Sequence, residues 1–342
     1  MTLVAHSDLP AFSYLHDEGY EVLSPEEAGR QDIRELHIGL LNMMPDAALR
    51  ATERQFFRLV GSCNRIVQIC IHPFCVDTHA RSAEAQDYIA RYYADFETLK
   101  ADGLDALIVT GANPAQNDIT REPFWDPMIE VVEWARRNVT SILCSCLASH
   151  GLLKHFFGIE RRRREAKCWG VYSHRVVDPS HPLVRHVNTR FDAPRSHVYE
   201  MTREQVESVG GVVLAHGDAG WHLATSPDGF RFVFLQGHPE YDPDSLLKEY
   251  KREMQRFSAG TRDLPPYPES YLSADALAVL EPHRQASIAA RAEGKDAPEF
   301  PEPAVRPLLD NTWLDTGKGI FNNWLGLVYQ RTHLDRRMPV VD

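Results

Sequence analysis

The chain has 342 residues, of which 43% are hydrophobic and 25% are charged. This is the composition of a globular protein that is long enough to bury a sizeable core. Its 37 Lys and Arg residues stand against 48 Asp and Glu residues, so the formal charge is −11. An excess of acid disfavours general nucleic-acid binding. A membrane span is not expected, because no apolar run approaches about 18 residues. A signal peptide is not expected, because the start, MTLVAHSDLPAF, lacks the charged and apolar regions of one.

The chain contains six cysteines, which are too few for a disulfide scaffold in a chain of this length. We therefore expect free thiols and a cytoplasmic location. A metal site is the alternative use of such residues, with candidate ligands His72, Cys75, Cys144 and Cys146. No paired CxxC spacing accompanies them, so no metal is expected.

The first half alternates between predicted strands and helices, after a polar lead-in at 1–34 that contains an early helix. Strands are expected at 36–42, 66–73, 104–110 and 139–145, and helices at 46–60, 80–99 and 123–138. Alternation with short connections predicts an α/β fold, with a mostly parallel sheet and helices on both faces. Ligands of such sheets bind outside the carboxyl ends of the strands. Residues 111–116 and Cys146 both lie at that predicted edge.

The second half is less regular. Strands are expected at 170–177, 212–215, 220–225 and 230–236, followed by a helix at 243–256 and a final helix at 311–330. Residues 261–310 are rich in Pro, Ala and Glu, and 273–306 are expected to form a partly helical, mobile insertion. The predicted division is a lead-in (1–34), a core (35–260), an insertion (261–310) and a C-terminal helix that packs on the core (311–342).

The stretch 139–159, VTSILCSCLASHGLLKHFFGI, carries the clearest chemical signal. A buried strand passes into a helix at Cys146, and a cysteine at such a sharp turn exposes its sulfur. The helix N-terminus behind it favours the thiolate and offers N–H groups to an oxyanion. The alternative is that Cys144 and Cys146 are small core residues. The convergence of Cys146 and 111–116 on one sheet edge favours a nucleophile elbow.

A thiol nucleophile needs a base, and the base needs an orienting group. His238 and Glu240 fit these roles, because they follow a predicted strand and project to the same side of extended backbone. Pro239 between them biases His238 toward that geometry. The alternative is a histidine that merely precedes a turn. The GHPEY context favours acyl-enzyme chemistry by Cys146, His238 and Glu240, but it does not identify the acyl donor.

Four consecutive arginines at 161–164 admit two interpretations. The favoured one is a solvated surface turn. The other is a cradle for phosphate groups, because guanidinium forks match phosphate oxygens.

Several separated motifs resemble one known family. They are LLNMMPDAALRATERQFFRL (40–59), GLDALIVTGANP (103–114), the elbow with FFGI, EAKCWGVYSHRV (165–176), APRSH (193–197), QGHPEYD (236–242) with the helix that follows it, and NNWL (322–325). Together they resemble the homoserine O-acyltransferase family of methionine biosynthesis. That resemblance implies a class I glutamine-amidotransferase-like fold, which is a flavodoxin-like α/β architecture.

The resemblance implies catalytic roles for three residues. Cys146 would be the acyl-thioester nucleophile, His238 the proton acceptor and Glu240 its partner. The implied reaction moves an acyl group from acyl-coenzyme A to the hydroxyl of L-homoserine in two half-reactions. Acyl-coenzyme A is then a co-substrate, and no cofactor is expected. A homodimer is also expected from the resemblance.

Three further positions match substrate-binding residues of the family: Lys167, Ser196 and Arg252. Arg252 can grip a carboxylate by two hydrogen bonds, and Lys167 can stabilise a negative oxygen. In the family, the loop that corresponds to the one after Gly111 resembles a size filter for the acyl donor. A glutamate in that loop accompanies acetyl transfer, and a small residue accompanies succinyl transfer. The matching position is Ala115, which favours succinyl-coenzyme A over acetyl-coenzyme A.

The chain departs from the family pattern at four places. Leu147 and His150 stand where Trp and Gln are common, and the usual His-Ser-Arg triplet reads RSH at 195–197. The Gly-Ala-Pro loop reads GANP, and 273–306 lies outside the usual pattern. The choice between homoserine and serine stays open, because one methylene changes binding by only about 1–3 kcal/mol.

Three rival functions use the same residues. A glutaminase would share the Cys–His–Glu chemistry, but the elbow lacks the glycines that flank the nucleophile in that family. A cysteine hydrolase has no separate cue in the sequence. A catalytically silent binding protein is disfavoured by the presence of Cys146, His238 and Glu240 together.

Overall fold

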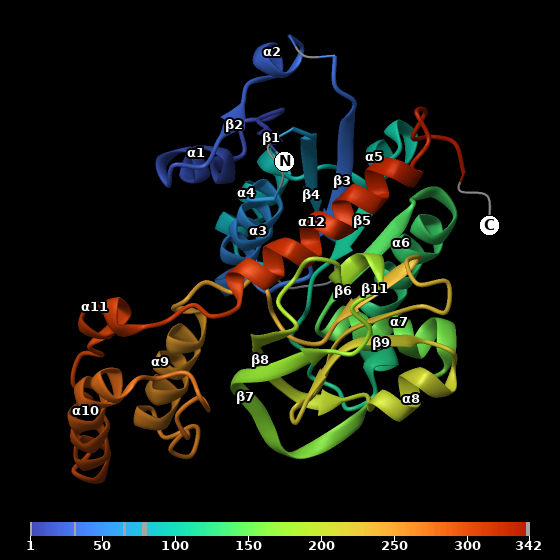
Figure 1. The fold of residues 1–342 in the computed structure, drawn as a ribbon. Helices are drawn as coiled ribbons and strands as arrows, with labels where there is room; N and C mark the ends of the chain where they lie inside the picture. The colour runs from blue at the N-terminus through green and yellow to red at the C-terminus, as the bar shows by residue number, and fades with distance from the viewer. Residues whose placement is uncertain (1, 31, 64–65, 77–80, 340–342) are drawn as a thin grey trace.

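One sheet runs through the whole molecule (Figure 1). The computed structural model describes residues 2–30, 32–63, 66–76 and 81–339. In these residues the sheet has 11 strands, in the order β2-β1-β4-β3-β5-β6-β11-β10-β9-β7-β8. The strands are β1 (Thr2–Val4), β2 (Val22–Leu23), β3 (Glu35–Leu41), β4 (Gln68–Phe74), β5 (Ala106–Val109), β6 (Ser141–Ser145), β7 (Arg162–Val176), β8 (Arg190–Glu200), β9 (Val212–Gly217), β10 (Gly220–Thr225) and β11 (Phe232–Leu235).

Helices connect most of these strands. The α-helices are α1 (Pro10–Asp17), α2 (Pro25–Ala28), α3 (Asp46–Gly61), α4 (Ala83–Tyr92), α5 (Phe96–Asp102), α6 (Trp125–Asn138), α7 (Leu147–Phe157), α8 (Arg203–Ser208), α9 (Ser245–Ser258), α10 (Ala274–Ala292), α11 (Glu302–Val305) and α12 (Leu314–Arg331). Three short 3₁₀ turns are η1 (Ile119–Arg121), η2 (Pro182–Val184) and η3 (Arg306–Leu308).

The strands from β2 to β11 in this order pair in parallel, and β10, β9, β7 and β8 pair antiparallel. The predicted α/β class with a mostly parallel sheet is therefore confirmed. The register places Val109 of β5 and Phe234 of β11 on either side of Cys144 in β6. Since these three strands are parallel, their carboxyl ends meet at one edge of the sheet.

Helices cover both faces of the parallel strands, as predicted (Figure 1). One face packs against α1, α3 and α12, with Phe57 and Trp324 in its core. The other face packs against α6 and α7, with Met128 in its core. Because alternate strand residues point to opposite faces, Ile38 belongs to the first core and Leu41 to the second.

Two features of the first half were not predicted. The lead-in supplies β1 and β2, which extend the sheet beyond β4. Strands of three and two residues are too short to show a period of two in the sequence. The helix expected at 80–99 is two helices, because Asp95 accepts a 3.0 Å hydrogen bond from Thr98 N–H and begins α5 anew. Three predicted segments reach beyond the described residues. They are the lead-in at residue 1, the helix at residue 80 and the C-terminal segment at 340–342.

The hairpin formed by β7 and β8 differs from expectation. Arginines 162–164 begin the long strand β7 and do not form a surface turn. Its partner β8 was not predicted. Strand β8 buries the polar residues Arg195 and His197 on its inner face, so the usual apolar alternation is missing from its sequence.

Residues 261–310 form helices that pack on α9, in the lower left of Figure 1. Helix α10 follows Ser273, whose hydroxyl accepts a 3.1 Å hydrogen bond from Ala276 N–H. Leu280 and Phe300 share a third core with Tyr250 of α9 and Trp169 of β7. The segment therefore has its own packed core, whereas we expected a mobile insertion.

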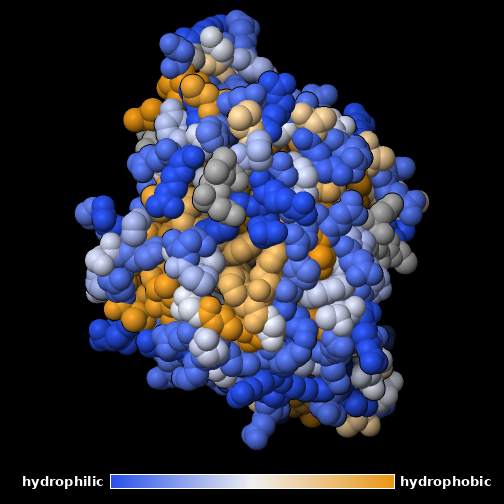
Figure 2. Space-filling model, turned by 90° about the vertical axis from the view of Figure 1, so that its right-hand side faces the viewer, coloured by the Kyte–Doolittle hydropathy of each residue, from blue (hydrophilic) through white to orange (hydrophobic). Residues whose placement is uncertain are grey.

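The surface is mostly polar. Figure 2 shows the face that lies to the right in Figure 1, where hydrophilic residues surround several apolar patches. The large apolar side chains that are exposed in the described residues are Tyr14, Ile66, Val177, Val198, Leu334 and Met338. Among the described residues, none of the helices combines the length and hydropathy that a membrane crossing requires.

Candidate active site

Cys146 lies at the turn from β6 to α7, with φ 51° and ψ −108°. A positive φ is uncommon for a residue other than glycine and is retained where the surrounding structure holds it. The N–H of Cys146 donates to the carbonyl of Leu235 at 2.7 Å. The Ser149 hydroxyl lies 2.9 Å from the carbonyl of Cys144 and 3.0 Å from that of Leu235. This is the elbow geometry predicted for the turn.

Backbone atoms of neighbouring residues lie close to the Cys146 side chain, and one of them is an N–H hydrogen-bond donor. The side chain of Cys146 is half-buried. A Cβ on Gly111, at the end of β5, would lie 3.7 Å from the Cys146 Cβ and 4.0 Å from the Leu147 nitrogen. Leu147 is the first residue of α7, so its N–H has no partner within the helix. That N–H is available to an oxyanion that forms beside the sulfur.

His238 and Glu240 follow β11 and are brought to Cys146, as predicted. Nδ1 of His238 lies 2.7 Å from Oε1 of Glu240, and both residues are buried. The side chain of Cys146 acts electrostatically on His238 and favours its protonated form. Ser145, one residue before the nucleophile, donates a 3.4 Å hydrogen bond to the same Glu240 oxygen. The three side chains thus gather a candidate nucleophile, a candidate base and an orienting carboxylate at one place.

The charges around His238 favour its protonated form. Burial lowers its pKa, but the carboxylate of Glu240 and the side chain of Cys146 outweigh burial, so the net pKa is well above the usual value. The ring of Tyr241 stacks on the imidazole, with centroids 4.2 Å apart. The N–H of His238 donates to the carbonyl of Pro194 on β8 at 2.9 Å. The imidazole is therefore held by Glu240 and Tyr241, and the backbone of His238 is held by β8.

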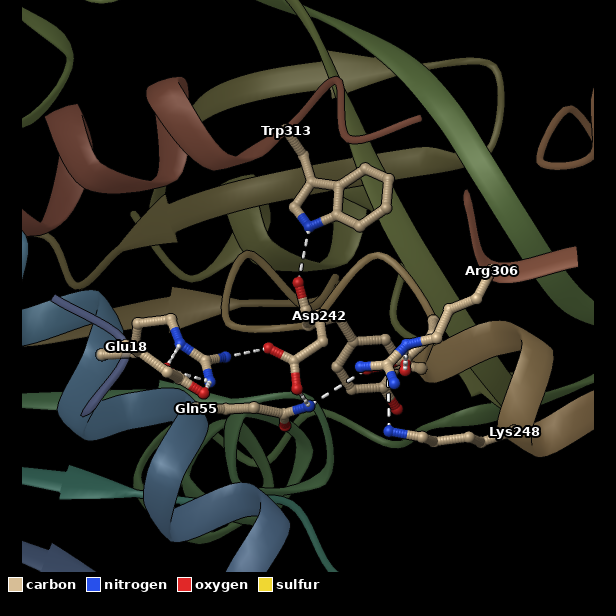
Figure 3. A network of polar contacts seen from close by, with 10 residues as sticks. Glu18, Gln55, Asp242, Lys248, Arg306 and Trp313 are labelled. Atoms are coloured by element: carbon tan, nitrogen blue, oxygen red, sulfur yellow. Dashed lines mark hydrogen bonds and ion pairs between the residues drawn. The ribbon is translucent and has the colours of Figure 1, made fainter. Parts of the chain in front are cut away.

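The loop that carries His238 and Glu240 is tied to three distant segments (Figure 3). Asp242 forms an ion pair with Arg58 of α3, and Arg58 also binds Glu18 in the lead-in at 3.0 Å. Gln55 Nε2 donates to Asp242 at 3.3 Å. The indole N–H of Trp313, before α12, donates to the Tyr241 carbonyl at 2.9 Å. The lead-in and the C-terminal segment therefore both support the loop that carries His238 and Glu240.

Asp244 extends this network into residues 261–310. Arg306 lies with its Nε 2.9 Å from Asp244 Oδ2, and Lys248 Nζ lies 3.0 Å from Oδ1 (Figure 3). Asp244 is buried, whereas the Arg306 side chain is 64% exposed. The segment 261–310 is thus joined to the start of α9, which faces the site.

Two predicted substrate residues meet on a carboxylate that we did not predict. Glu249 of α9 accepts a 2.6 Å hydrogen bond from the Ser196 hydroxyl and lies 3.2 Å from Lys167 Nζ. The hydroxyl of Tyr241 donates to the other Glu249 oxygen at 3.0 Å. Burial raises the pKa of Glu249, but Lys167, Ser196 and His238 outweigh it, so the net pKa is below the usual value. A charged carboxylate therefore lies near the candidate base His238.

Glu249 could not be found from sequence, because its partners are 53 and 82 residues away. One signal was present: Glu249 and the predicted Arg252 are three residues apart, on one side of a helix. Arg252 is exposed and has its Nε 3.6 Å from Glu253. The structure therefore brings Lys167 and Ser196 together, while Arg252 lies one helical turn further along α9.

Ala115 is exposed on the loop between β5 and η1. Arg161 holds this loop: its guanidinium donates to the carbonyls of Gln116 at 2.6 Å and Asn117 at 2.8 Å. The same guanidinium lies 4.0 Å above the Tyr199 ring, and the Tyr199 hydroxyl bonds to Asn117. The loop proposed to select the donor is therefore fixed by a residue of the arginine run.

The four arginines do not act as one group. Arg161 is occupied by the loop, and Arg164 forms an ion pair with Glu200 of β8. Arg162 and Arg163 are exposed. Arg161 and Arg164 are therefore engaged in contacts within the protein, and the exposed side chains of Arg162 and Arg163 are the more accessible candidates for a phosphate contact.

The exchanged triplet at 195–197 has a structural explanation. Residues 195 and 197 are alternate residues of β8 and share a face, so exchanging Arg and His keeps both on that face. Arg195 is buried, with 3.0 Å and 2.5 Å hydrogen bonds to the carbonyls of Ala219 and Trp221, and it lies 3.4 Å from His197. Ser196 keeps the opposite face and reaches Glu249.

His150, which stands where the family commonly has Gln, is buried behind the elbow. Its Nε2 lies 2.6 Å from Nε2 of Gln236. Burial and the nearby Arg161 take its pKa to about 3. It is therefore a neutral residue that pairs α7 with the end of β11.

Residues 2–334 match the family model described as homoserine O-succinyltransferase. The chain belongs to the homoserine O-succinyltransferase family. The predicted resemblance is thus confirmed. The match includes 273–306, so the expectation that this segment lies outside the family pattern was wrong.

Relatives in the homoserine O-succinyltransferase family match over the full length. The protein of that name from Methylobacter tundripaludum is 56% identical, covering 100% of this chain and 97% of the relative. That from Nitrosococcus oceani is 57% identical, covering 100% and 96%. Among solved structures, a glutamine amidotransferase from Methylobacillus flagellatus aligns with a TM-score of 0.45 and 10% identity, covering 86% of this chain and 95% of that one.

Proposed function

We propose that this chain transfers a succinyl group from succinyl-coenzyme A to the hydroxyl of L-homoserine, through a thioester on Cys146. The observation that carries the proposal is that Cys146, His238 and Glu240 come together at the carboxyl edge of the sheet, with Nδ1 of His238 2.7 Å from Glu240 and Cys146 acting on the charge of His238. The name of the family agrees with the succinyl donor that Ala115 favours.

In the first half-reaction the thiolate of Cys146 attacks the succinyl carbonyl. The Leu147 N–H stabilises the oxyanion, and His238 gives its proton to the sulfur of coenzyme A as that thiolate leaves. His238 is then neutral and Cys146 carries the succinyl group. Because one thioester replaces another, the two sides are similar in energy.

In the second half-reaction the acylated enzyme uses His238 as a base. Cys146 helps to raise the pKa of His238. Once the sulfur is an uncharged thioester, this contribution is lost, so the pKa of His238 falls and the imidazole can accept the homoserine hydroxyl proton. The homoserine oxygen attacks the thioester, Cys146 leaves as thiolate, and the starting ion pair is restored.

The acceptor would be held by the cluster around Glu249. We assign the binding of homoserine to Lys167, Ser196 and Arg252, with Arg252 directed at the carboxylate of the amino acid. Glu249 holds Lys167 and Ser196 in place. The donor pocket would include Ala115, whose small side chain neither fills the site nor repels the second carboxylate of succinate.

The test measures coenzyme A release with a thiol dye, using homoserine or serine with succinyl- or acetyl-coenzyme A. Homoserine-dependent release that is lost in Cys146→Ala, but kept in the matched Cys63→Ala variant, supports the proposal. Ala115→Glu should lower kcat/KM for succinyl-coenzyme A by about tenfold or more, the equivalent of about 1.4 kcal/mol. Ammonia formed from glutamine without release of coenzyme A would instead indicate a glutaminase.

The remaining expectations are part of the same proposal. No cofactor is required by the two half-reactions. A cytoplasmic location is consistent with six free cysteines. A homodimer is expected, and sedimentation equilibrium would measure it directly.

A further inference from the structure

Three side chains of metal-ligand type gather at the end of the sheet opposite to Cys146. Glu35 and His37 are alternate residues at the start of β3, so they share a face. Cys70 of β4 is the register partner of His37. The catalytic edge lies at the other ends of these parallel strands, so this cluster is separate from the active site.

The donor atoms of the three residues are close enough to share one ion. One donor atom of each residue lies within 4.8 Å of the others. His37 Nε2 and the Glu35 carboxylate are 3.4 Å apart. Two ligands of a tetrahedral zinc ion are about 3.3–3.6 Å apart, given bond lengths of about 2.0–2.3 Å. A small side-chain movement would therefore complete the geometry.

A fourth residue, His72, orients His37. Nδ1 of His37 lies 3.0 Å from Nε2 of His72, and the two rings stack with an angle of 13° between their planes. The His6 ring covers His72, with centroids 4.5 Å apart. A metal-binding histidine usually donates its other N–H to such a partner, which fixes the ring. His72 can do this for His37 and leave Nε2 directed at Glu35.

The groups around the cluster carry charges of both signs. The carboxylate of Asp105 accepts a 2.8 Å hydrogen bond from the backbone N–H of His37 and pairs with Arg34 at 3.0 Å. Because the thiolate is the form of cysteine that binds a metal, a cation bound here has to displace the proton of the Cys70 thiol.

We propose that Glu35, His37 and Cys70 form a binding site for a divalent transition-metal cation of the zinc type. A carboxylate, an imidazole and a thiolate are the donors that Zn²⁺ takes, and the Glu35 side chain is 40% exposed, which leaves the fourth position to water. Binding breaks the S–H bond of Cys70, forms a metal–sulfur bond and releases one proton to solvent. Among the described residues, no other group of three or more His, Cys, Asp or Glu side chains has its donor atoms this close together.

The site would join β3 to β4 near the lead-in, and its role would be structural. His6 and Cys70 both contact this part of the chain, and Cys70 shares a small core with Val4, Leu23 and Ala28. An ion there would hold the first strands of the sheet together. It would take no part in the reaction at Cys146.

Cobalt titration of the chelator-treated full chain tests the proposal. One equivalent of Co²⁺ should give the thiolate-to-cobalt absorption band of a tetrahedral site, and Zn²⁺ should remove that band. The band should be lost in Cys70→Ser and in His37→Ala. It should persist in Cys63→Ser and Cys146→Ser, which are matched cysteine controls.

Glu35→Gln keeps the proposal testable if the Cys70 variant does not fold, because this side chain is partly exposed. It should weaken Co²⁺ binding at least about tenfold. One equivalent of Zn²⁺ should also raise the melting temperature of the wild type, and not that of His37→Ala. The proposal is overturned if the wild type gives no band, if the band survives in Cys70→Ser, or if it disappears in Cys146→Ser.

Discussion

The Ser196 hydroxyl donates a 2.6 Å hydrogen bond to the carboxylate of Glu249, which also binds Lys167 at 3.2 Å. Glu249→Gln removes the charge that holds Lys167 and leaves one amide oxygen for Ser196. We expect the KM for homoserine to rise about tenfold, equivalent to about 1.4 kcal/mol, with a smaller change in kcat. Two-substrate steady-state kinetics would measure both constants.

The KM for succinyl-coenzyme A should stay near the wild-type value in Glu249→Gln. Glu293→Gln, an exposed residue after α10, is the control for a change of charge alone. An unchanged KM for homoserine in Glu249→Gln would contradict the assignment of this cluster to the acceptor.

The pair of His238 and Glu240 should control the pH dependence. Glu240 raises the pKa of His238, so Glu240→Gln should lower it. The first half-reaction needs protonated His238, and so the alkaline limb of kcat/KM for succinyl-coenzyme A should move to lower pH. The maximal value should also fall by about 10²–10⁴-fold, as for other oriented histidines.

A pH series of initial rates on both proteins would measure that shift. Glu130→Gln on α6 is a matched control, because Glu130 is exposed and remote from His238 in the sequence. An alkaline limb at the same pH in Glu240→Gln would show that Glu240 does not set the ionisation of His238.

The ion pair between Arg58 and Asp242 should support the catalytic loop. Their side chains are 17% and 16% exposed. Arg58→Ala leaves Asp242 and Glu18 without this partner and should reduce the free energy of unfolding by about 1–3 kcal/mol. It should also lower kcat more than it raises KM, because the loop carries His238. Urea unfolding and steady-state kinetics would measure the two effects.

The matched control is Arg50→Ala on the same helix. Arg50 pairs with Glu84 on the surface, where the side chains are 54% and 80% exposed. Such a pair contributes under about 1 kcal/mol. If Arg58→Ala were as stable and as active as Arg50→Ala, the network in Figure 3 would have no role in holding the loop.

Arg161 should act on the donor through the loop at 112–117. Arg161→Ala removes the hydrogen bonds to the Gln116 and Asn117 carbonyls. We expect the KM for succinyl-coenzyme A to rise about 5- to 10-fold, equivalent to about 1–1.4 kcal/mol, while the KM for homoserine changes little. Steady-state kinetics at several salt concentrations would measure it.

The double variant Arg162→Ala/Arg163→Ala separates the loop from a phosphate contact. If the exposed pair binds phosphate groups of coenzyme A, this variant should raise the same KM in a salt-dependent way. Equal KM values for wild type and double variant would remove the phosphate hypothesis. An unchanged KM in Arg161→Ala would remove the role of the loop clamp.

The meeting of Cys146, His238 and Glu240 was predictable because most of the information that it needs is local. Cys146 is marked by a strand that turns directly into a helix. His238 and Glu240 are two residues apart after another strand, so their common direction follows from extended backbone. The alternation of apolar runs likewise predicted the parallel strands β3 to β6.

The acceptor cluster and the supports of the loop were not predictable, because their partners are far apart in the chain. Lys167 and Glu249 are separated by 82 residues, and Arg58 and Asp242 by 184. Strand β8 was missed because it buries Arg195 and His197. Burial of a guanidinium is possible only where carbonyls from another hairpin satisfy it, which no local pattern shows.

The sequence by itself determined the fold class, the elbow and the three residues of the triad, since each follows from periodicity or from neighbouring residues. The tertiary structure decided that Glu249 gathers Lys167 and Ser196, that Arg161 holds the donor loop, and that the lead-in extends the sheet. These depend on which distant groups meet in the folded chain. The physical reason is that a buried charge or polar group is stable only beside its partner, and the partner's position is set by the packing of the whole chain.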